Sequence, residues 1–259
     1  MRLLFMLRVL LAATILCAAP AHAAISPGAG ADGNPAGELF FTVWDATNQV
    51  SYTRDLGISI LDFLANPNQG ITRAPDPLYN STFGGVNPST LVYSVGAFNY
   101  RNEDFPCCFG MVISSSNPVE QVTLPDVTAL ATALSVGGFY VVGANANDGG
   151  DPQDFASNRS SVSHSGDAGY WGGENWNGNI GNTVPFTTGA AVGTSIAFYA
   201  LLLDEDGFAV NTTAFSSMWT LAADGTLTYG AGAVPLPAAF WLLLCALGSV
   251  VGHSRRSRA

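Results

Sequence analysis

Two apolar segments, one at each end of the chain, confine the folded domain to the residues between them. At the N-terminus, two arginines precede the apolar run Val9–Cys17, and small residues follow at Ala21 and Ala23. This order predicts a secretory signal peptide over residues 1–23, which signal peptidase removes after Ala23. We therefore expect residues 24–233 to fold outside the cytoplasm.

The C-terminal segment has three parts in order: a proline motif, an apolar stretch and a basic end. The stretch from Leu236 to Gly252 carries no charge, and as a helix it would be about 26 Å long. A bilayer core of roughly 30 Å makes this a short transmembrane helix, while a buried helix of the domain is the other interpretation. The residues of the three parts are Val234, Pro235, Leu236, Pro237 and Ala238, then Trp241, then Arg255, Arg256 and Arg258.

These three parts resemble the PEP-CTERM sorting signal in its VPLPA variant. The resemblance covers residues 234–259, with Leu236 in the place where the more common form has glutamate. It implies an exosortase as partner in a Gram-negative bacterium. It also implies a transient stay in the inner membrane, followed by transfer to the cell surface or extracellular matrix. It implies no function for residues 24–233.

The exported segment is strongly acidic. All nine basic residues are arginines, and five of them lie in the terminal signals, so four arginines face nineteen acids between residues 24 and 233. The net charge of that segment is therefore near −15. Such a surface repels phosphate backbones and argues against nucleic acid as a partner. It keeps the protein soluble and can attract divalent cations.

The composition favours strands and turns, because Gly, Ser, Thr, Asn and Val are abundant. We predict an all-β domain, a β-sandwich of Ig-like or jelly-roll character, with one or two short helices. Residues 230–233 are expected to form a spacer to the sorting signal. The predicted strands are Leu39–Trp44, Leu91–Phe98, Phe109–Ser114, Phe139–Ala144, Thr194–Leu203 and Trp219–Tyr229. The predicted helices are Asp126–Val136 and Ile58–Ala65.

Two features refine this outline. Asp224-Gly225 stands between alternating apolar arms, which is a strong hairpin signal. The Gly/Asn/Ser-rich stretch Asn145–Asn182 is long for one loop, so it is either a functional excursion or several short strands.

Catalytic machinery is not recognisable in the exported segment. His164 is its only histidine, which excludes a zinc site with several histidine ligands. The serines and aspartates around His164 are more typical of a solvated polar loop than of a catalytic triad. An acidic pair for glycoside hydrolysis stays open, because such a pair is defined by distance in space.

Calcium is the one metal that a local pattern suggests. Oxygen-bearing side chains alternate around a glycine turn, and calcium prefers six to eight such ligands. Ala156 stands where an EF-hand would have its closing glutamate, so a solvated acidic turn is the other interpretation. No other cofactor is expected. The candidate ligands are Asn145, Asn147, Asp148, Asp151 and Asp154.

An aromatic cluster suggests a sugar site. Tyr170, Trp171 and Trp176 are interleaved with glycine and asparagine. Aromatic rings pack on sugar C–H faces while amides bind hydroxyl groups. Tryptophans of β-sandwiches also fill cores, and that interpretation stays open.

Cys107 and Cys108 are the only cysteines outside the terminal segments. Their Cα atoms lie about 3.8 Å apart across a trans peptide bond, below the usual disulfide range. A vicinal disulfide, an intermolecular bridge and free thiols are all open.

Two functions follow from these patterns. The first is an exported, non-enzymatic surface or matrix protein that associates with exopolysaccharide. The second is an exported carbohydrate-binding protein or carbohydrate-active enzyme that uses an acidic pair.

Overall fold

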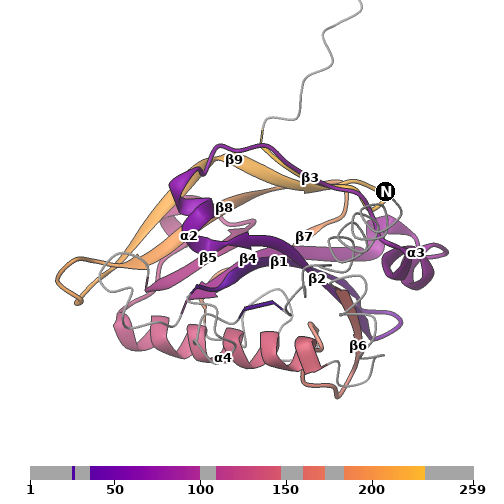
Figure 1. Ribbon diagram of the computed structural model, residues 1–259, viewed down its shortest axis with the longest axis horizontal. Helices are drawn as coiled ribbons and strands as arrows, with labels where there is room; N and C mark the ends of the chain where they lie inside the picture. Colours follow the sequence, from indigo (N-terminus) through magenta and orange to yellow (C-terminus); the bar gives the residue numbers. More distant parts are fainter. Residues whose placement is uncertain (1–24, 27–35, 100–108, 147–159, 173–183, 231–259) are drawn as a thin grey trace, which may run out of the picture.

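A computed structural model shows one curled antiparallel sheet with helices packed on it (Figure 1). The structure describes residues 25–26, 36–99, 109–146, 160–172 and 184–230. The predicted signal peptide and the predicted C-terminal membrane helix lie outside these residues, and both stay predictions.

Ten strands form the sheet in the order β3-β10-β9-β8-β5-β4-β1-β2-β6, with β7 paired to β4. The strands are β1 Glu38–Asp45, β2 Val50–Ser59, β3 Ile71–Arg73, β4 Leu91–Asn99, β5 Gly110–Ser115, β6 Ser160–His164, β7 Ala190–Ala191, β8 Ser195–Leu203, β9 Val210–Leu221 and β10 Leu227–Tyr229. The helices are α2 Ile60–Ala65, α3 Pro77–Phe83 and α4 Val127–Ala146, with 3-10 turns at Pro88–Thr90 and Val119–Gln121.

The central strands are buried on both faces. In β1, Phe41 points into the core inside the curl, whereas its neighbour Phe40 packs in a second core under α4. Residues of β8 alternate in the same way, with Phe198 inside and Tyr199 outside. Because both faces need apolar side chains, these strands read as continuous apolar runs in the sequence.

Two short helices lie at opposite ends of the curl (Figure 1). Ser59 caps α2, because its hydroxyl accepts the N–H of Asp62 at 3.0 Å. Phe63 of α2 packs edge-on against Phe198 with 5.3 Å between ring centroids. In α3, Tyr79 and Phe83 are buried in the same core. The core inside the curl is therefore closed by aromatic side chains from both helices.

Helix α4 covers the outer face of the sheet (Figure 1). Asp126 caps it by accepting the N–H of Ala129 at 2.8 Å. Within the described residues it is the one helix long and apolar enough to cross a membrane. Its buried side chains, such as Leu130 and Leu134, pack in the outer core, as expected for a core helix. A Cβ on Gly137 would lie 2.5 Å from the ring of Phe98, so glycine allows this close contact.

The strand-rich fold is confirmed, but several details differ from the prediction. The described strands form one sheet, so a two-sheet sandwich is not confirmed. The predicted strand Phe139–Ala144 is wrong, because α4 continues through Gly137 and Gly138 to Ala146 and is not short. Packing of α4 on the sheet overrides the β-propensity of Phe, Tyr and Val in that stretch.

The remaining element predictions agree with the structure or extend it. The predicted strands around β1, β4, β5 and β8 and the helix α2 are confirmed. The Asp224-Gly225 turn joins β9 to β10, and φ of Gly225 is +85°. Strand β2 was not predicted, and β9 begins at Val210, well before the predicted strand Trp219–Tyr229. Polar residues occupy much of both strands.

Candidate functional site

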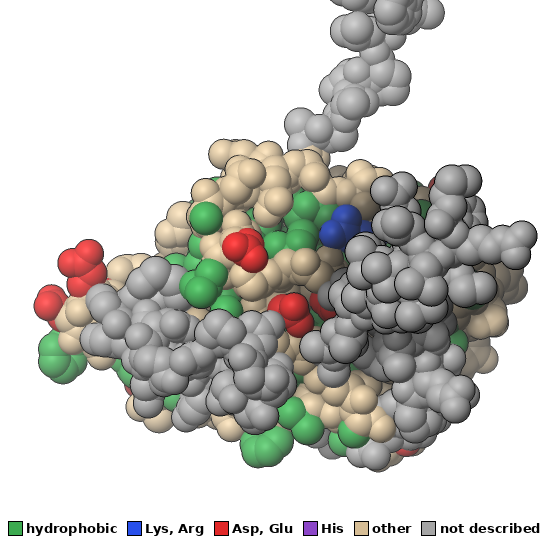
Figure 2. Space-filling view, in the orientation of Figure 1, with side chains coloured by type: hydrophobic (Ala, Val, Ile, Leu, Met, Phe, Trp, Pro, Cys, Tyr) green, Lys and Arg blue, Asp and Glu red, His purple; other side chains and the backbone are tan. Residues whose placement is uncertain are grey.

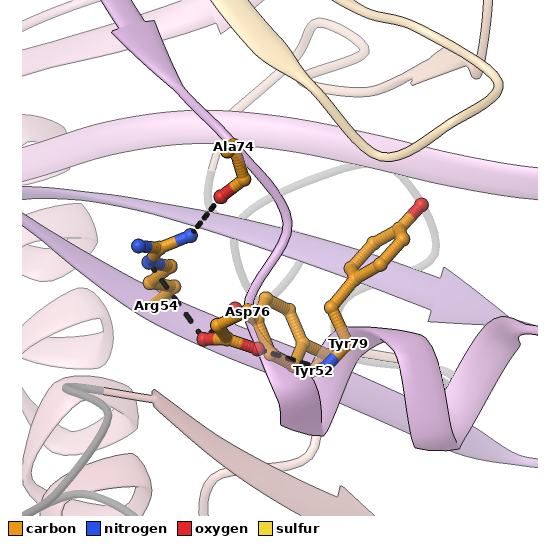
Figure 3. Close-up of polar contacts among 5 residues, drawn as sticks. All are labelled: Tyr52, Arg54, Ala74, Asp76 and Tyr79. Atoms are coloured by element: carbon orange, nitrogen blue, oxygen red, sulfur yellow. Dashed lines mark hydrogen bonds and ion pairs between the residues drawn. The ribbon is translucent and has the colours of Figure 1, made fainter.

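A buried carboxylate joins β2 to α3 (Figure 3). Asp76 precedes α3, is only 7% exposed and accepts a hydrogen bond from the Tyr52 hydroxyl at 2.6 Å. Its other oxygen accepts the backbone N–H of Tyr79 at 2.8 Å and so caps the helix. The Nε of Arg54 lies 3.7 Å from the carboxylate, and Nη1 donates to the carbonyl of Ala74 at 2.6 Å. The buried charge is therefore fully partnered.

Tyr52 stays protonated in this cluster. Burial raises the pKa of Tyr52 well above its ordinary value, and the negative charge of Asp76 raises it further. A phenol with such a pKa donates a hydrogen bond at neutral pH and does not exchange its proton as an acid or base. The cluster positions α3 and supplies no catalytic group of its own.

A pocket of about 240 Å³ lies beside the cluster, between α3 and the turn from β9 to β10. Tyr79 belongs to both, since its N–H binds Asp76 and its ring lines the pocket. Burial, followed by the charge of Asp224, raises the pKa of Tyr79 to about 12. Hydrogen bonds from Thr226 lower the pKa of Asp224. At neutral pH the pocket therefore holds a neutral phenol beside a carboxylate.

The pocket lining favours binding over chemistry. Asn80 adds an amide, and no cationic side chain occurs among the lining residues. The polar groups can bind hydroxyl groups of a neutral ligand, whereas Asp224 repels anions. The lining residues include no nucleophile paired with a base. The apolar part of the lining comes from Phe83, Val86, Pro88 and Leu91.

Most described acids form turns or helix caps. Asp45 is fully buried and accepts the N–H groups of Thr47 and Asn48 in the turn after β1. Asp204 closes the turn between β8 and β9 in the same way. Acids used like this shape the backbone. Other acids that accept backbone N–H groups are Glu38, Asp55, Asp76, Asp126, Asp167 and Asp224.

The predicted sugar site has a different place in the fold. Trp171 is only 1% exposed and packs edge-on against Tyr140 at 5.3 Å between ring centroids. Tyr170 is buried as well, and its hydroxyl accepts a hydrogen bond from Nε1 of Trp44 at 2.9 Å. Trp176 lies outside the described residues. Because the ring of Trp171 is covered, the structure supports its core interpretation and corrects the surface interpretation for this residue.

The polar stretch around His164 is a strand and not a loop. It forms β6, which pairs with β2 and buries Ser161 and Ser163. His164 is at its end, with Nδ1 4.0 Å from the carboxylate of Asp167. The described residues of the long polar stretch Asn145–Asn182 contain one strand, β6, and the choice between a functional excursion and several short strands stays open.

Of the predicted calcium ligands, only Asn145 belongs to the described residues. Asn145 lies in the last turn of α4, and its amide exchanges two hydrogen bonds with the backbone of Ile25, at 3.0 and 2.7 Å. Asn147, Asp148, Asp151 and Asp154 lie outside the described residues. In the described part of the chain, no group of three or more His, Cys, Asp or Glu side chains is placed to hold a metal ion.

Other predicted sites also fall outside the described residues. They are Cys107 and Cys108, the cleavage-site residues Ala21 and Ala23, and the sorting residues Val234, Pro235, Leu236, Pro237, Ala238, Trp241, Arg255, Arg256 and Arg258.

Sequence reasoning missed the cluster around Asp76. The signal was present, because Asp76-Pro77 places a capping side chain before a proline that suits the first helical position. The partners Tyr52 and Arg54 come from β2 and could not be assigned without the fold.

Comparison with known proteins gave no match, either to family models, to curated proteins or to solved structures. The proposals below therefore depend on the residues and their geometry.

Proposed function

We propose that the chain is an exported, non-enzymatic surface or matrix protein that an exosortase sorts through its C-terminal segment. The observation that carries this proposal is the order of the tail: Val234–Ala238, an uncharged stretch and terminal arginines. The N-terminal segment supports it, because a signal peptide would place residues 24–233 on the same outer side. Signal peptidase and exosortase are the partners of this route, and the inner membrane holds the precursor.

The described domain is consistent with a structural role. Its buried carboxylate and its turn-forming acids stabilise the backbone, so they account for part of the acidic composition without a reaction. Calcium stays a proposal for the acidic stretch that follows Asn145. The curled sheet is, in this proposal, a sandwich-like scaffold, since Tyr93 of β4 donates to the carbonyl of Trp219 across the curl at 3.0 Å.

The pocket beside Tyr79 favours a second candidate, an exported carbohydrate-binding protein. A phenol, an amide and a carboxylate beside apolar side chains are groups that bind sugar hydroxyls and C–H faces. A pocket of about 240 Å³ has room for about eight water molecules, which limits it to a small ligand. This candidate is compatible with association with exopolysaccharide.

Removing residues 234–259 tests the sorting proposal. The full chain is expected at the cell surface or in the matrix, and the shortened chain is expected in the periplasm or medium without processing. A chain in which Arg255, Arg256 and Arg258 become alanine is the matched control for the basic end alone. Unchanged localisation and size of the shortened chain would overturn the proposal.

Incubation with polysaccharide from the bacterium that makes the protein separates a carbohydrate-binding protein from a hydrolase. A binder is pulled down with the polymer and releases no reducing ends, and Asn80→Ala should weaken retention if the pocket is used. Release of reducing sugars would assign an enzyme instead.

A further inference from the structure

The pocket beside α3 contains a buried hydroxyl group that has no hydrogen-bond partner in the described part of the chain. Tyr79 is only 5% exposed and lines the pocket, while its backbone N–H is bound to Asp76. Its side chain points away from that carboxylate (Figure 3). Within the described residues, its hydroxyl group makes no hydrogen bond. Because a buried hydroxyl group without a partner costs free energy, this group is suited to bind a molecule that enters the pocket.

A carboxylate lies at the same pocket, on the turn from β9 to β10. Asp224 lines the pocket, and it is close enough to Tyr79 for its charge to raise the pKa of the phenol. Oδ1 of Asp224 accepts the N–H of Thr226 at 2.9 Å, which holds the side chain in place. Hydrogen bonds from Thr226 also lower the pKa of Asp224, so the group is ionised at neutral pH. A carboxylate accepts several hydrogen bonds, so a ligand can bind as well.

The charge of the pocket favours an organic cation over a metal ion or an anion. Asp224 is the only charged side chain among the lining residues that the structure describes. One carboxylate does not provide the set of oxygen ligands that calcium prefers, and its charge repels anions. A protonated amine is attracted by the same charge and donates up to three hydrogen bonds. The pocket is therefore suited to a ligand that carries an ammonium group.

The rest of the lining suits a small ring with hydroxyl groups. The amide of Asn80 can donate to and accept from such groups, while Phe83 and Leu91 offer apolar surface to C–H groups. We propose that the pocket binds an amino sugar in its protonated form, with the ammonium group paired to Asp224 and a neighbouring hydroxyl group bound to Tyr79. This inference rests on the carbohydrate-binding candidate and deepens it by naming the class of sugar.

Titration of the purified full chain in detergent micelles, followed by NMR at constant pH, tests the proposal. The probes are glucosamine, glucose and N-acetylglucosamine, and the signals are the backbone amides of α3 and of the turn around Asp224. Glucosamine should bind at least about threefold more tightly than the two neutral sugars, because only glucosamine forms the ion pair. Equal binding of the three sugars would overturn the inference and leave the carbohydrate-binding candidate intact. Absence of shifts at these amides with all three sugars would overturn both.

A fully deacetylated glucosamine tetramer distinguishes two sources of the ligand. Binding as tight as that of glucosamine would support a free amino sugar, and tighter binding would support a unit of a polymer. A tetramer that shifts none of the pocket amides, although glucosamine does, would restrict the site to the free sugar. None of these results depends on localisation, so they are independent of the sorting proposal.

Two acids that precede and follow β9 give matched variants. Asp224→Ser removes the charge but keeps an oxygen that can accept the N–H of Thr226, so the preference for glucosamine should disappear. Asp206→Ser removes the same charge before β9, outside the pocket lining, and the preference should remain. Equal effects of the two variants would contradict an ion pair at Asp224.

Tyr79→Phe separates binding from stability. This variant keeps the ring and the backbone N–H that binds Asp76, and it removes only the hydroxyl group. Glucosamine binding should weaken at least about twofold, whereas the urea midpoint should not fall. Unchanged binding would contradict the role given to the hydroxyl group, and a lower midpoint with unchanged binding would assign it a structural role instead.

Discussion

The two faces of the sheet are packed in different ways. Inside the curl, aromatic rings meet at steep angles, as in the pair Tyr52–Tyr79 at 5.5 Å and 85°, and a buried carboxylate holds them in place. On the outer face, α4 approaches the sheet closely through Gly137, which lies against the ring of Phe98. The inner face therefore has a buried carboxylate among its aromatic rings, whereas the outer face has a glycine at its closest helix–sheet contact.

Apolar side chains are scattered over the visible side of the molecule (Figure 2). Green apolar side chains lie among tan side chains and backbone, with a few red acidic groups and one blue basic group on this side. The side chain of Phe139 on α4 is 74% exposed, although its neighbour Tyr140 is buried. Helix α4 carries no charged residue, so its outward side differs from the acidic turns of the strands.

Removing one large ring from each core should have the largest effect. We expect Phe198→Ala inside the curl and Trp171→Ala under α4 each to lower the free energy of unfolding by about 3–5 kcal/mol. Both residues are essentially buried, so each substitution leaves a cavity. Urea unfolding measures the change. A loss below about 1 kcal/mol for Trp171→Ala would indicate that the ring is exposed, and the sugar-binding interpretation would then stand again.

The polar support of the inner core is tested at Asp76. Asp76→Ala should cost about 3 kcal/mol, because the Tyr52 hydroxyl and the Tyr79 N–H lose their acceptor and Arg54 loses its counter-charge. Asp76→Asn keeps an acceptor oxygen and is expected to cost less. Equal losses for the two variants, measured by urea unfolding, would mean that the capping oxygen is unimportant.

Two adjacent glycines test the close contact under α4. A Cβ at Gly137 would meet the ring of Phe98, so Gly137→Ala should cost about 1–3 kcal/mol. A Cβ built on Gly138 would meet no atom within 4 Å apart from its chain neighbours and the backbone of its own helix, so Gly138→Ala should stabilise the helix by up to about 1 kcal/mol. Thermal unfolding compares them. A stabilising Gly137→Ala would contradict the packing.

Alkaline pH should weaken the inner core. The pKa of Tyr52 is raised by burial and that of Tyr79 reaches about 12, so the folded state holds these protons more strongly than the unfolded state. Their contribution is complete below pH about 10 and is lost as the pH rises, with a slope that approaches a limit of about 1.4 kcal/mol per pH unit for each tyrosine above pH 10. Urea unfolding between pH 9 and pH 11 measures this slope. Tyr52→Phe should reduce it, and an unchanged slope would show that Tyr52 does not contribute.

The contrast between the two faces also explains which elements the sequence predicts. β1 and β8 are apolar on both sides and stand out as runs, for example Leu39–Trp44. β2 carries Ser, Thr, Arg and Asp, and several of these are buried, so its pattern does not identify it. In α4, Phe139–Ala144 has strand-forming residues, and only packing on the sheet makes it helical.

The candidate site was less predictable than the fold. The pair Asp76-Pro77 signals a helix start, but nothing local links it to Tyr52, which lies 24 residues earlier. Trp171 shows the opposite limit, because a stretch with tyrosine, tryptophan and glycine has the same composition in a sugar site and in a core. The residues that pack against these rings from other parts of the fold decide whether they form a sugar site or a core.

The intact mass of the protein recovered from the cell surface or medium tests the central claim most directly. We expect a chain that begins near Ala24 and has lost part of residues 234–259, because signal peptidase and then exosortase act on it. Recovery of a chain that still ends at Ala259 would contradict sorting by the tail, and a chain that still begins at Met1 would contradict export by the N-terminal segment.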